Sequence, residues 1–196
     1  MKLRRRLALS APFAALLLAG CGVNAIPTAE ENAKAKWADV ENQYQRRADL
    51  IPNLVATVKG YATHEQDTLT AVVDARAKAT QVTVNAGDLT DPDKMKQFQD
   101  AQNSLSGALG KLLSVQEAYP QLQADQNFLA LQSQLEGTEN RIAVARSDYN
   151  AAVQAYNTQI RTFPDSITAK VVYGAKPITP FTATTANAET APTVKF

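Results

Sequence analysis

The sequence predicts an all-α fold: an elongated antiparallel bundle of three to four long helices, followed by a largely irregular C-terminal tail. Three long stretches carry apolar residues at seven-residue spacing, which is typical of helices that pack side by side. A basic and then apolar stretch precedes them, and a Thr-, Ala- and Pro-rich stretch follows. These shifts divide the 196 residues into segments 1–20, 21–27, 28–164 and 165–196.

Segment 1–20 has the form of a signal peptide. Residues 1–6 include four basic side chains, and the apolar run from Leu7 to Leu18 is too short to span a bilayer. The run ends in Leu18-Ala-Gly-Cys21, which resembles the lipobox of bacterial lipoproteins. The resemblance implies that Cys21, the only cysteine, receives a diacylglyceryl thioether, and that the chain is cut before it and acylated at its new amino terminus. An ordinary secretory signal with a chance cysteine is the alternative.

The charge of the remaining chain argues against two classes of partner. Four of the 20 basic residues lie in segment 1–20, which leaves 16 basic residues against 19 acidic ones. No basic block remains after the signal, so the composition indicates neither nucleic-acid binding nor binding to anionic lipid head groups. Residues 21–27 read as a short lipidated tether to the first helix.

The first helical pattern begins at Thr28. Thr28 and Glu31 have the spacing of a capping box, which predicts Thr28 as N-cap. The apolar face follows at seven-residue steps: Trp37, Tyr44, Ile51 and Val58.

Pro52 interrupts this pattern, because a proline removes a helical hydrogen bond and clashes with the preceding turn. Two interpretations remain open. Either the helix kinks at Pro52, or a new helix begins there with Asp49 as its cap. The seven-residue spacing continues across Pro52, which favours the kink. Helical character is then expected to continue through Leu69, Val72 and Ala79.

The second pattern starts at Asp91, the predicted N-cap, with Pro92 at the first helical position. Its apolar face is formed by Phe98, Leu105, Leu112 and Tyr119, and Pro120 ends or bends it. A stripe of small residues lies beside this face and suits close approach by another helix: Ser104, Gly107, Gly110 and Ser114.

The third pattern is the most regular and predicts a helix of roughly 55 Å that ends at Pro164. Its apolar face recurs at six seven-residue steps: Phe128, Leu135, Ile142, Tyr149, Tyr156 and Phe163. Beyond it, residues 167–173 are expected to form a short strand or a docked extended segment.

Three stretches resemble the LemA family of bacterial envelope proteins. They are Gln45–Val55 with its continuation to Glu65, Tyr119–Ile142 and Ala145–Pro164, and the closing Ala-Pro-Thr-Val-Lys-Phe196 fits as well. The resemblance implies an antiparallel bundle, usually described as four helices, and no established enzymatic activity. Many members carry an uncleaved N-terminal transmembrane helix as anchor, and the lipobox departs from that pattern.

The residues offer little for catalysis or metal binding, so neither catalytic residues, a metal nor a cofactor is expected. His64 is the only histidine and cannot build a zinc site of the usual ligands alone. Glu136 and Glu139 share a helical face, but the histidine that accompanies such glutamates in di-iron bundles is missing.

Interaction residues are expected instead in two places. Glu139 and Arg141 are predicted to pair with polar groups of another helix, such as Arg46, Arg47 or Asp49, and so to fix register. The same residues, together with Asn140, are the expected interaction surface on the helices. Asn150 and Asn157 each follow a tyrosine, and they are expected either to fix register in the same way or to face solvent. At the chain's end, Val194 and Phe196 have the apolar-x-apolar-carboxylate form that some PDZ domains bind; the alternatives are packing on the bundle and a passive tail.

Together these observations predict a non-enzymatic interaction or scaffold module. It is held by lipid on a membrane of the bacterial cell envelope, faces away from the cytoplasm and binds an envelope protein. Gly22 is not the aspartate that commonly retains lipoproteins in an inner membrane, which favours the outer membrane if the source has two. A regulatory subunit or adaptor of an envelope protease, an uncharacterised enzyme and a purely structural lipoprotein are the alternatives.

Overall fold

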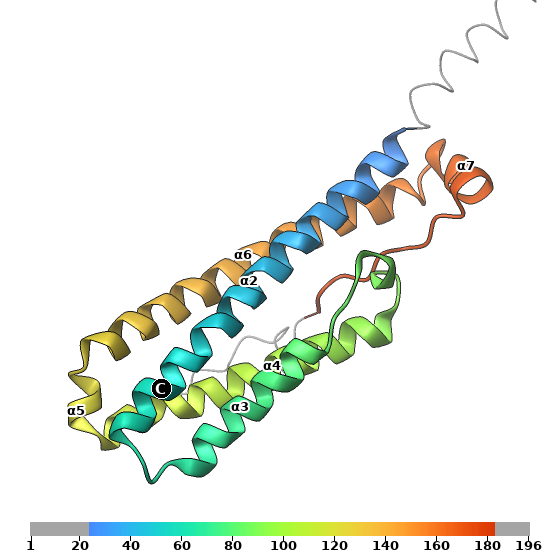
Figure 1. The fold of residues 1–196 in the computed structure, drawn as a ribbon. Helices are drawn as coiled ribbons and strands as arrows, with labels where there is room; N and C mark the ends of the chain where they lie inside the picture. Colours follow the sequence, from blue (N-terminus) through green and yellow to red (C-terminus); the bar gives the residue numbers. More distant parts are fainter. Residues whose placement is uncertain (1–23, 183–196) are drawn as a thin grey trace, which may run out of the picture.

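The computed structural model describes residues 24–182 and confirms the all-α prediction, with no strand in that range. Figure 1 shows four long helices packed side by side: α2 (Ala25–Tyr61), α3 (Gln66–Gln81), α4 (Pro92–Ser114) and α6 (Gln126–Gln159). Shorter helical pieces connect and follow them: η1 (Ala86–Asp88), η2 (Val115–Ala118), α5 (Pro120–Gln123), α7 (Asp165–Thr168) and η3 (Ala169–Tyr173). The principal contacts pair α2 with α6 and α3 with α4, and α2 also packs on α3.

Helix α2 differs from the prediction at its start. It begins at Ala25 with Asn24 at the cap position, so the expectation that Thr28 is the N-cap is wrong. The Thr28 hydroxyl lies inside the first turn and donates to the Asn24 carbonyl at 2.7 Å. A threonine hydroxyl inside a helix can donate to the carbonyl four residues before it, as an N–H group does. The earlier start also places Ile26 in the helix, where its side chain is buried.

Helix α2 continues through Pro52, so the interpretation in which a new helix begins there is wrong. The first reversal comes later, in residues 62–65, where the expected helical continuation is interrupted before α3 begins at Gln66. Pro52 lies on the exposed side of α2 and leaves the Ala48 carbonyl without its helical donor. Arg76 of α3 replaces that donor, because its Nε donates to the Ala48 carbonyl at 2.8 Å. The buried positions Ile51 and Leu54 hold the helix on the bundle on either side of Pro52.

Helix α4 begins as predicted, because the Asp91 carboxylate accepts from the backbone N–H groups of Asp93 and Lys94 and Pro92 takes the first position. Helix α6 buries the predicted face as far as Tyr156. Phe163 does not belong to that face, since α6 ends at Gln159 and the Phe163 side chain is 81% exposed.

The segment after α6 is also different from its prediction. Residues 165–173 form the helical pieces α7 and η3 and neither a strand nor an extended segment. Gly174, at φ 56° in the left-handed region that glycine tolerates, ends them. Residues 174–182 then return along the bundle, and Ile178 and Phe181 are buried in it. The packed body therefore starts before residue 28 and extends past residue 164.

The core consists of two clusters of apolar side chains, one above the other along the bundle. On α2 the first cluster ends at Tyr44 and the second begins at Ile51. On α6 the first cluster begins at Ile142 and the second ends at Leu135. Buried polar side chains fill the level between them: Arg47, Gln102 and Thr138.

Candidate functional site

Arg47 is the centre of the polar level that separates the two core clusters. Its side chain is 2% exposed and reaches from α2 toward α4 and α6. One terminal nitrogen donates to Ser106 Oγ at 2.7 Å and to Glu139 Oε2 at 3.0 Å. The other donates to Gln102 Oε1 at 2.7 Å and to the Gln102 carbonyl at 3.3 Å. We refer to Arg47, Gln102, Ser106 and Glu139 as the Arg47 layer.

The Arg47 layer ties together all four long helices, because the amide nitrogen of Gln102 donates to the Ala79 carbonyl of α3 at 3.1 Å. The predicted meeting of Glu139 with an arginine of α2 is thus seen in the structure, with Arg47 as the partner. Glu139 is 56% exposed and closes the layer from the solvent side, whereas Arg47 itself is internal and cannot reach an external partner. A buried guanidinium with these acceptors fixes how far each helix slides along its neighbours.

Replacing Arg47 with alanine tests this layer. We expect Arg47→Ala to lower the free energy of unfolding by about 2 kcal/mol, because it empties the site and leaves the buried acceptor of Gln102 without its donor. Arg46→Ala is the matched control, since Arg46 is the exposed neighbour on α2 and should change stability by less than about 0.5 kcal/mol. Urea unfolding followed by circular dichroism measures both, and equal effects would show that the layer has no special role.

A second polar arrangement holds the extended segment 174–182 on α6. The side-chain amide of Asn150 donates to the Phe181 carbonyl at 3.0 Å and accepts from the Phe181 N–H at 2.8 Å. The side-chain amide of Asn157 likewise donates to the Ile178 carbonyl at 2.8 Å and accepts from the Ile178 N–H at 2.9 Å. Each asparagine therefore satisfies both backbone groups of one residue, as a neighbouring β-strand would.

Two tyrosines extend the same pattern. The hydroxyl of Tyr149 lies 2.9 Å from the Thr179 carbonyl, and that of Tyr156 lies 3.2 Å from the Lys176 carbonyl. Burial raises the pKa of both phenols above the ordinary value, so both remain donors at neutral pH. We call Tyr149, Asn150, Tyr156 and Asn157 the Tyr-Asn ladder.

The spacing of the ladder follows from backbone geometry. Seven residues of an α-helix rise about 10.5 Å, and three residues of an extended chain cover about 10 Å. Residues seven apart on α6 therefore meet residues three apart on the segment, with the two chains running in opposite directions. The register is set by this match, since a shift of one residue on the segment would misplace both asparagines.

Phe181 anchors the segment in the first core cluster through its ring. Its centroid lies 5.7 Å from that of Trp37 and 5.6 Å from that of Tyr149, and the guanidinium of Arg146 lies 4.7 Å above it. Trp37 also contacts Phe98 edge-to-face at 5.3 Å. This aromatic group joins α2, α4, α6 and the segment.

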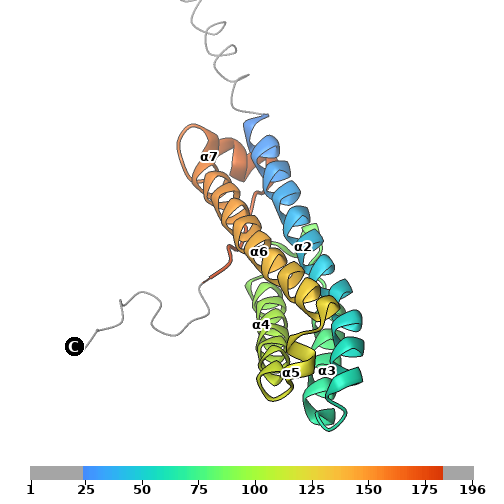
Figure 2. The same ribbon diagram turned by 90° about the vertical axis from the view of Figure 1, so that its left-hand side faces the viewer.

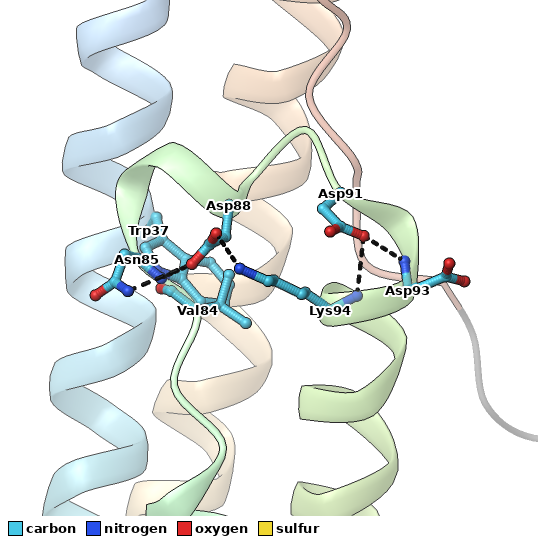
Figure 3. A network of polar contacts seen from close by, with 7 residues as sticks. All are labelled: Trp37, Val84, Asn85, Asp88, Asp91, Asp93 and Lys94. Atoms are coloured by element: carbon cyan, nitrogen blue, oxygen red, sulfur yellow. Dashed lines mark hydrogen bonds and ion pairs between the residues drawn. The ribbon is translucent and has the colours of Figure 1, made fainter.

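The loop between α3 and α4 packs against the first core cluster beside Trp37 (Figure 3). The Trp37 indole donates to the Val84 carbonyl at 2.8 Å, and the Thr179 N–H donates to the Leu89 carbonyl at 2.8 Å. One hydrogen bond from Trp37 of α2 and one from Thr179 of the extended segment therefore hold the loop in place.

Figure 3 also shows the polar contacts that give the loop its shape. One oxygen of Asp88 accepts from the backbone and side-chain nitrogens of Asn85, and its other oxygen pairs with Lys94. The Lys94 ammonium, and next the Asn85 N–H, hold the pKa of Asp88 below its usual value. These contacts join the loop to the first turn of α4.

Removing one asparagine of the ladder should loosen the segment. We expect Asn157→Ala to cost about 1–2 kcal/mol, because two hydrogen bonds are lost and the backbone of Ile178 is left without them. Hydrogen exchange of the Ile178 amide should become faster at the same time. Asn140→Ala, at an exposed position of the same helix, is the control; unchanged exchange in Asn157→Ala would contradict the role of the ladder.

The other predicted interaction residues lie on the outer face of α2 and α6. Arg46, Asp49, Asn140 and Arg141 are exposed. Asn140 and Arg141 line a hollow of about 340 Å³ together with residues of α2 and α6 on the same face: Asp39, Gln43, Val144, Ala145 and Asp148. Arg46 continues the α2 side of this face, seven residues after Asp39. Asp49 is exposed further along α2, where its carboxylate accepts from the Gln45 amide at 2.7 Å. We call this face the α2–α6 outer face.

Three predicted residues cannot be placed, since Cys21, Val194 and Phe196 lie outside the described residues. Their roles stay predictions. Within residues 24–182, no group of three or more His, Cys, Asp or Glu side chains is arranged to hold a metal ion. In the same range no helix combines the length and apolar character needed to cross a bilayer.

Comparison with known proteins gives the family. The chain is 30% identical over 157 residues to magnetosome protein MamQ 1 of Paramagnetospirillum magneticum and 29% identical over the same length to MamQ of Magnetospirillum gryphiswaldense. Both alignments cover 72% of this chain and 58% of the relative, so the chain matches little more than half of those proteins. Protein LemA of Metamycoplasma hominis is 30% identical over 61% of this chain and 50% of its own. The LemA family model matches residues 36–196, and the chain belongs to the LemA family.

Proposed function

We propose that the protein is a lipid-anchored module of the bacterial cell envelope that binds another envelope protein without catalysing a reaction. The anchor is the acylated Cys21, and the body faces away from the cytoplasm. The tether is short, because four residue steps separate Cys21 from the first residue of α2 and span at most about 14 Å.

The observation that carries the binding role is the α2–α6 outer face. Val144 is 63% exposed in the hollow of this face, although it is a large apolar side chain in the middle of a helix. Polar and charged residues surround it, and the Gln43 side-chain oxygen is buried without a hydrogen-bond partner in the described part of the chain. An apolar centre within a polar rim is the usual anatomy of a protein interface.

Site-specific crosslinking in intact cells tests this proposal. A photoreactive amino acid at Val144 should capture one partner in stoichiometric amount, whereas the same group at Ala155, an exposed position further along α6, should not. Equal capture at both positions, or none at Val144, would count against the outer face as the binding surface.

The anchor has a separate test. Cys21→Ala should release the protein from the membrane fraction, and mass spectrometry of the wild-type protein should find the acyl chains on Cys21. A membrane-bound Cys21→Ala protein of unchanged electrophoretic mobility would contradict lipid anchoring.

A further inference from the structure

The segment between α6 and the Tyr-Asn ladder exposes an unusual amount of apolar surface. Phe163 is 81% exposed, Val171 79%, Val172 63% and Ile167 58%. Outside residues 163–173, large apolar residues are exposed at only a few positions of the described residues 24–182, and those are scattered singly over α2, α3 and α6: Tyr61, Val73, Leu129 and Val144. Grouped exposed apolar side chains of this kind mark an interaction site by themselves, without the polar hollow that surrounds Val144.

The apolar surface belongs to a fixed part of the fold. Ala169, in the middle of α7 and η3, is 1% exposed and packs into the first core cluster. Its carbonyl accepts from the Ala175 N–H at 2.9 Å, which closes the segment after Gly174. Ile167 and Val171 lie four residues apart and share a side of this short helical piece. The piece is thus held by one side and presents apolar groups on another.

The location of this surface identifies what it contacts. Figures 1 and 2 both show α7 beside the start of α2, at one end of the bundle. The site of the proposed lipid, Cys21, is four residues before Ala25 and therefore within about 14 Å of that end. Helices that lie in a membrane interface bury their apolar face by about 5–10 Å, which this distance permits.

The charge around the surface fits the same partner. Residues 161–176 contain three basic side chains, Arg161, Lys170 and Lys176, all exposed, and one acidic side chain, Asp165. Asp165 accepts from the Gln159 amide at 2.9 Å. This segment is therefore positive, whereas the chain after residue 20 has an excess of acid. Apolar groups beside lysine and arginine are typical of surfaces that bind acidic phospholipids.

We propose that Phe163, Ile167, Val171 and Val172 insert into the interface of a bilayer that contains acidic phospholipids. This contact would be a second attachment beside the acyl chains of Cys21. It would also fix the orientation of the bundle, since a tether alone leaves the body free to turn. The inference rests on the proposed function in one respect: the lipid brings this end of the bundle to the membrane.

Fluorescence quenching tests the insertion. The full protein, purified from membranes with its native amino terminus, is reconstituted in phosphatidylethanolamine–phosphatidylglycerol vesicles whose acyl chains carry bromine. Trp37, the single tryptophan, is 1% exposed in the core and supplies a constant background. Val171→Trp should show a blue-shifted emission that brominated lipid quenches. Val144→Trp, at a position that is also well exposed but lies on the α2–α6 outer face, should show neither effect.

The outcomes separate this inference from the anchor. If Cys21 is acylated and Val171→Trp is not quenched, the insertion is wrong and the proposed function stands. If Cys21 carries no lipid, yet Cys21→Ala still binds the vesicles and Val171→Trp is quenched, the insertion stands and the anchor falls. Quenching at Val144→Trp equal to that at Val171→Trp would overturn the insertion, because contact would then not be confined to this end. Phe163→Ser combined with Val171→Ser should weaken vesicle binding of the Cys21→Ala protein without lowering its melting temperature.

Discussion

Trp37→Ala should lower the free energy of unfolding by about 3–5 kcal/mol, the range for removing a buried tryptophan side chain. Trp37 is 1% exposed and contacts the rings of Phe98, Tyr149 and Phe181. The substitution therefore leaves a cavity where α2, α4, α6, the α3–α4 loop and the C-terminal segment meet. Since small domains are stable by only about 5–15 kcal/mol, this loss is a large part of the total.

Trp37→Phe separates packing from hydrogen bonding. It keeps an aromatic ring but removes the donor of the Val84 carbonyl, so we expect a smaller loss of about 1–2 kcal/mol together with faster hydrogen exchange in the α3–α4 loop. Urea unfolding monitored by far-ultraviolet circular dichroism compares the variants. A loss below about 1 kcal/mol for Trp37→Ala would mean that the aromatic group does not hold the first core cluster together.

Ile142→Asp should be at least as damaging, with an expected loss of about 4 kcal/mol or more, because it places a carboxylate without a partner in the core. Ile142 is 2% exposed and is the first α6 residue of the first core cluster. The carboxylate can avoid its charge only by taking up a proton, so the loss should shrink as the pH falls below neutrality.

Val144→Asp is the matched control for Ile142→Asp. Val144 lies two residues further along α6 and is 63% exposed, so the same charge there should change stability by less than about 0.5 kcal/mol. Thermal unfolding of the two variants side by side checks the prediction. Equal melting temperatures would remove Ile142 from the core.

The long helices could be predicted from the sequence because their burial is periodic. Trp37, Ile51, Leu105, Leu135 and Tyr149 stand at seven-residue steps and are all buried. Such a pattern arises only when one side of a long helix stays in contact with its neighbours. The fold class can therefore be predicted from the sequence. The Asp91 cap can be predicted as well, because its geometry depends only on neighbouring residues.

The connections were harder to predict because local chemistry is ambiguous there. Pro52 is a strong helix breaker in isolation, yet α2 continues through it because Ile51 and Leu54 are packed in the core on either side. The true reversal at Thr63 and His64 carries no proline or glycine, and the tertiary packing of α3 on α2 decides it. Phe163 continues the seven-residue pattern in sequence, but α6 has already ended.

The candidate sites were predictable only in part, for a related reason. The pairing of Glu139 with an arginine of α2 follows from side chains of opposite charge on facing helices, but which of Arg46 and Arg47 turns inward depends on helix rotation. The Tyr-Asn ladder binds backbone groups, and backbone groups carry no signal in the sequence. Residues 167–173 suggest a strand or an extended segment from sequence, because valine and isoleucine are frequent in strands.

The Tyr-Asn ladder has a consequence beyond this chain. Tyr-Asn occurs at 149–150 and again at 156–157, and the hydrogen bonds of the four side chains with the extended segment are all made to main-chain atoms. The identity of most residues in that segment is then nearly free, provided that its length and its two inward-facing side chains are kept. A repeated Tyr-Asn pair seven residues apart on a long helix is accordingly a pattern that can be searched for in other helical proteins. Wherever it occurs on a face that no other helix covers, a strand-like stretch of chain is expected to lie along it in the opposite direction.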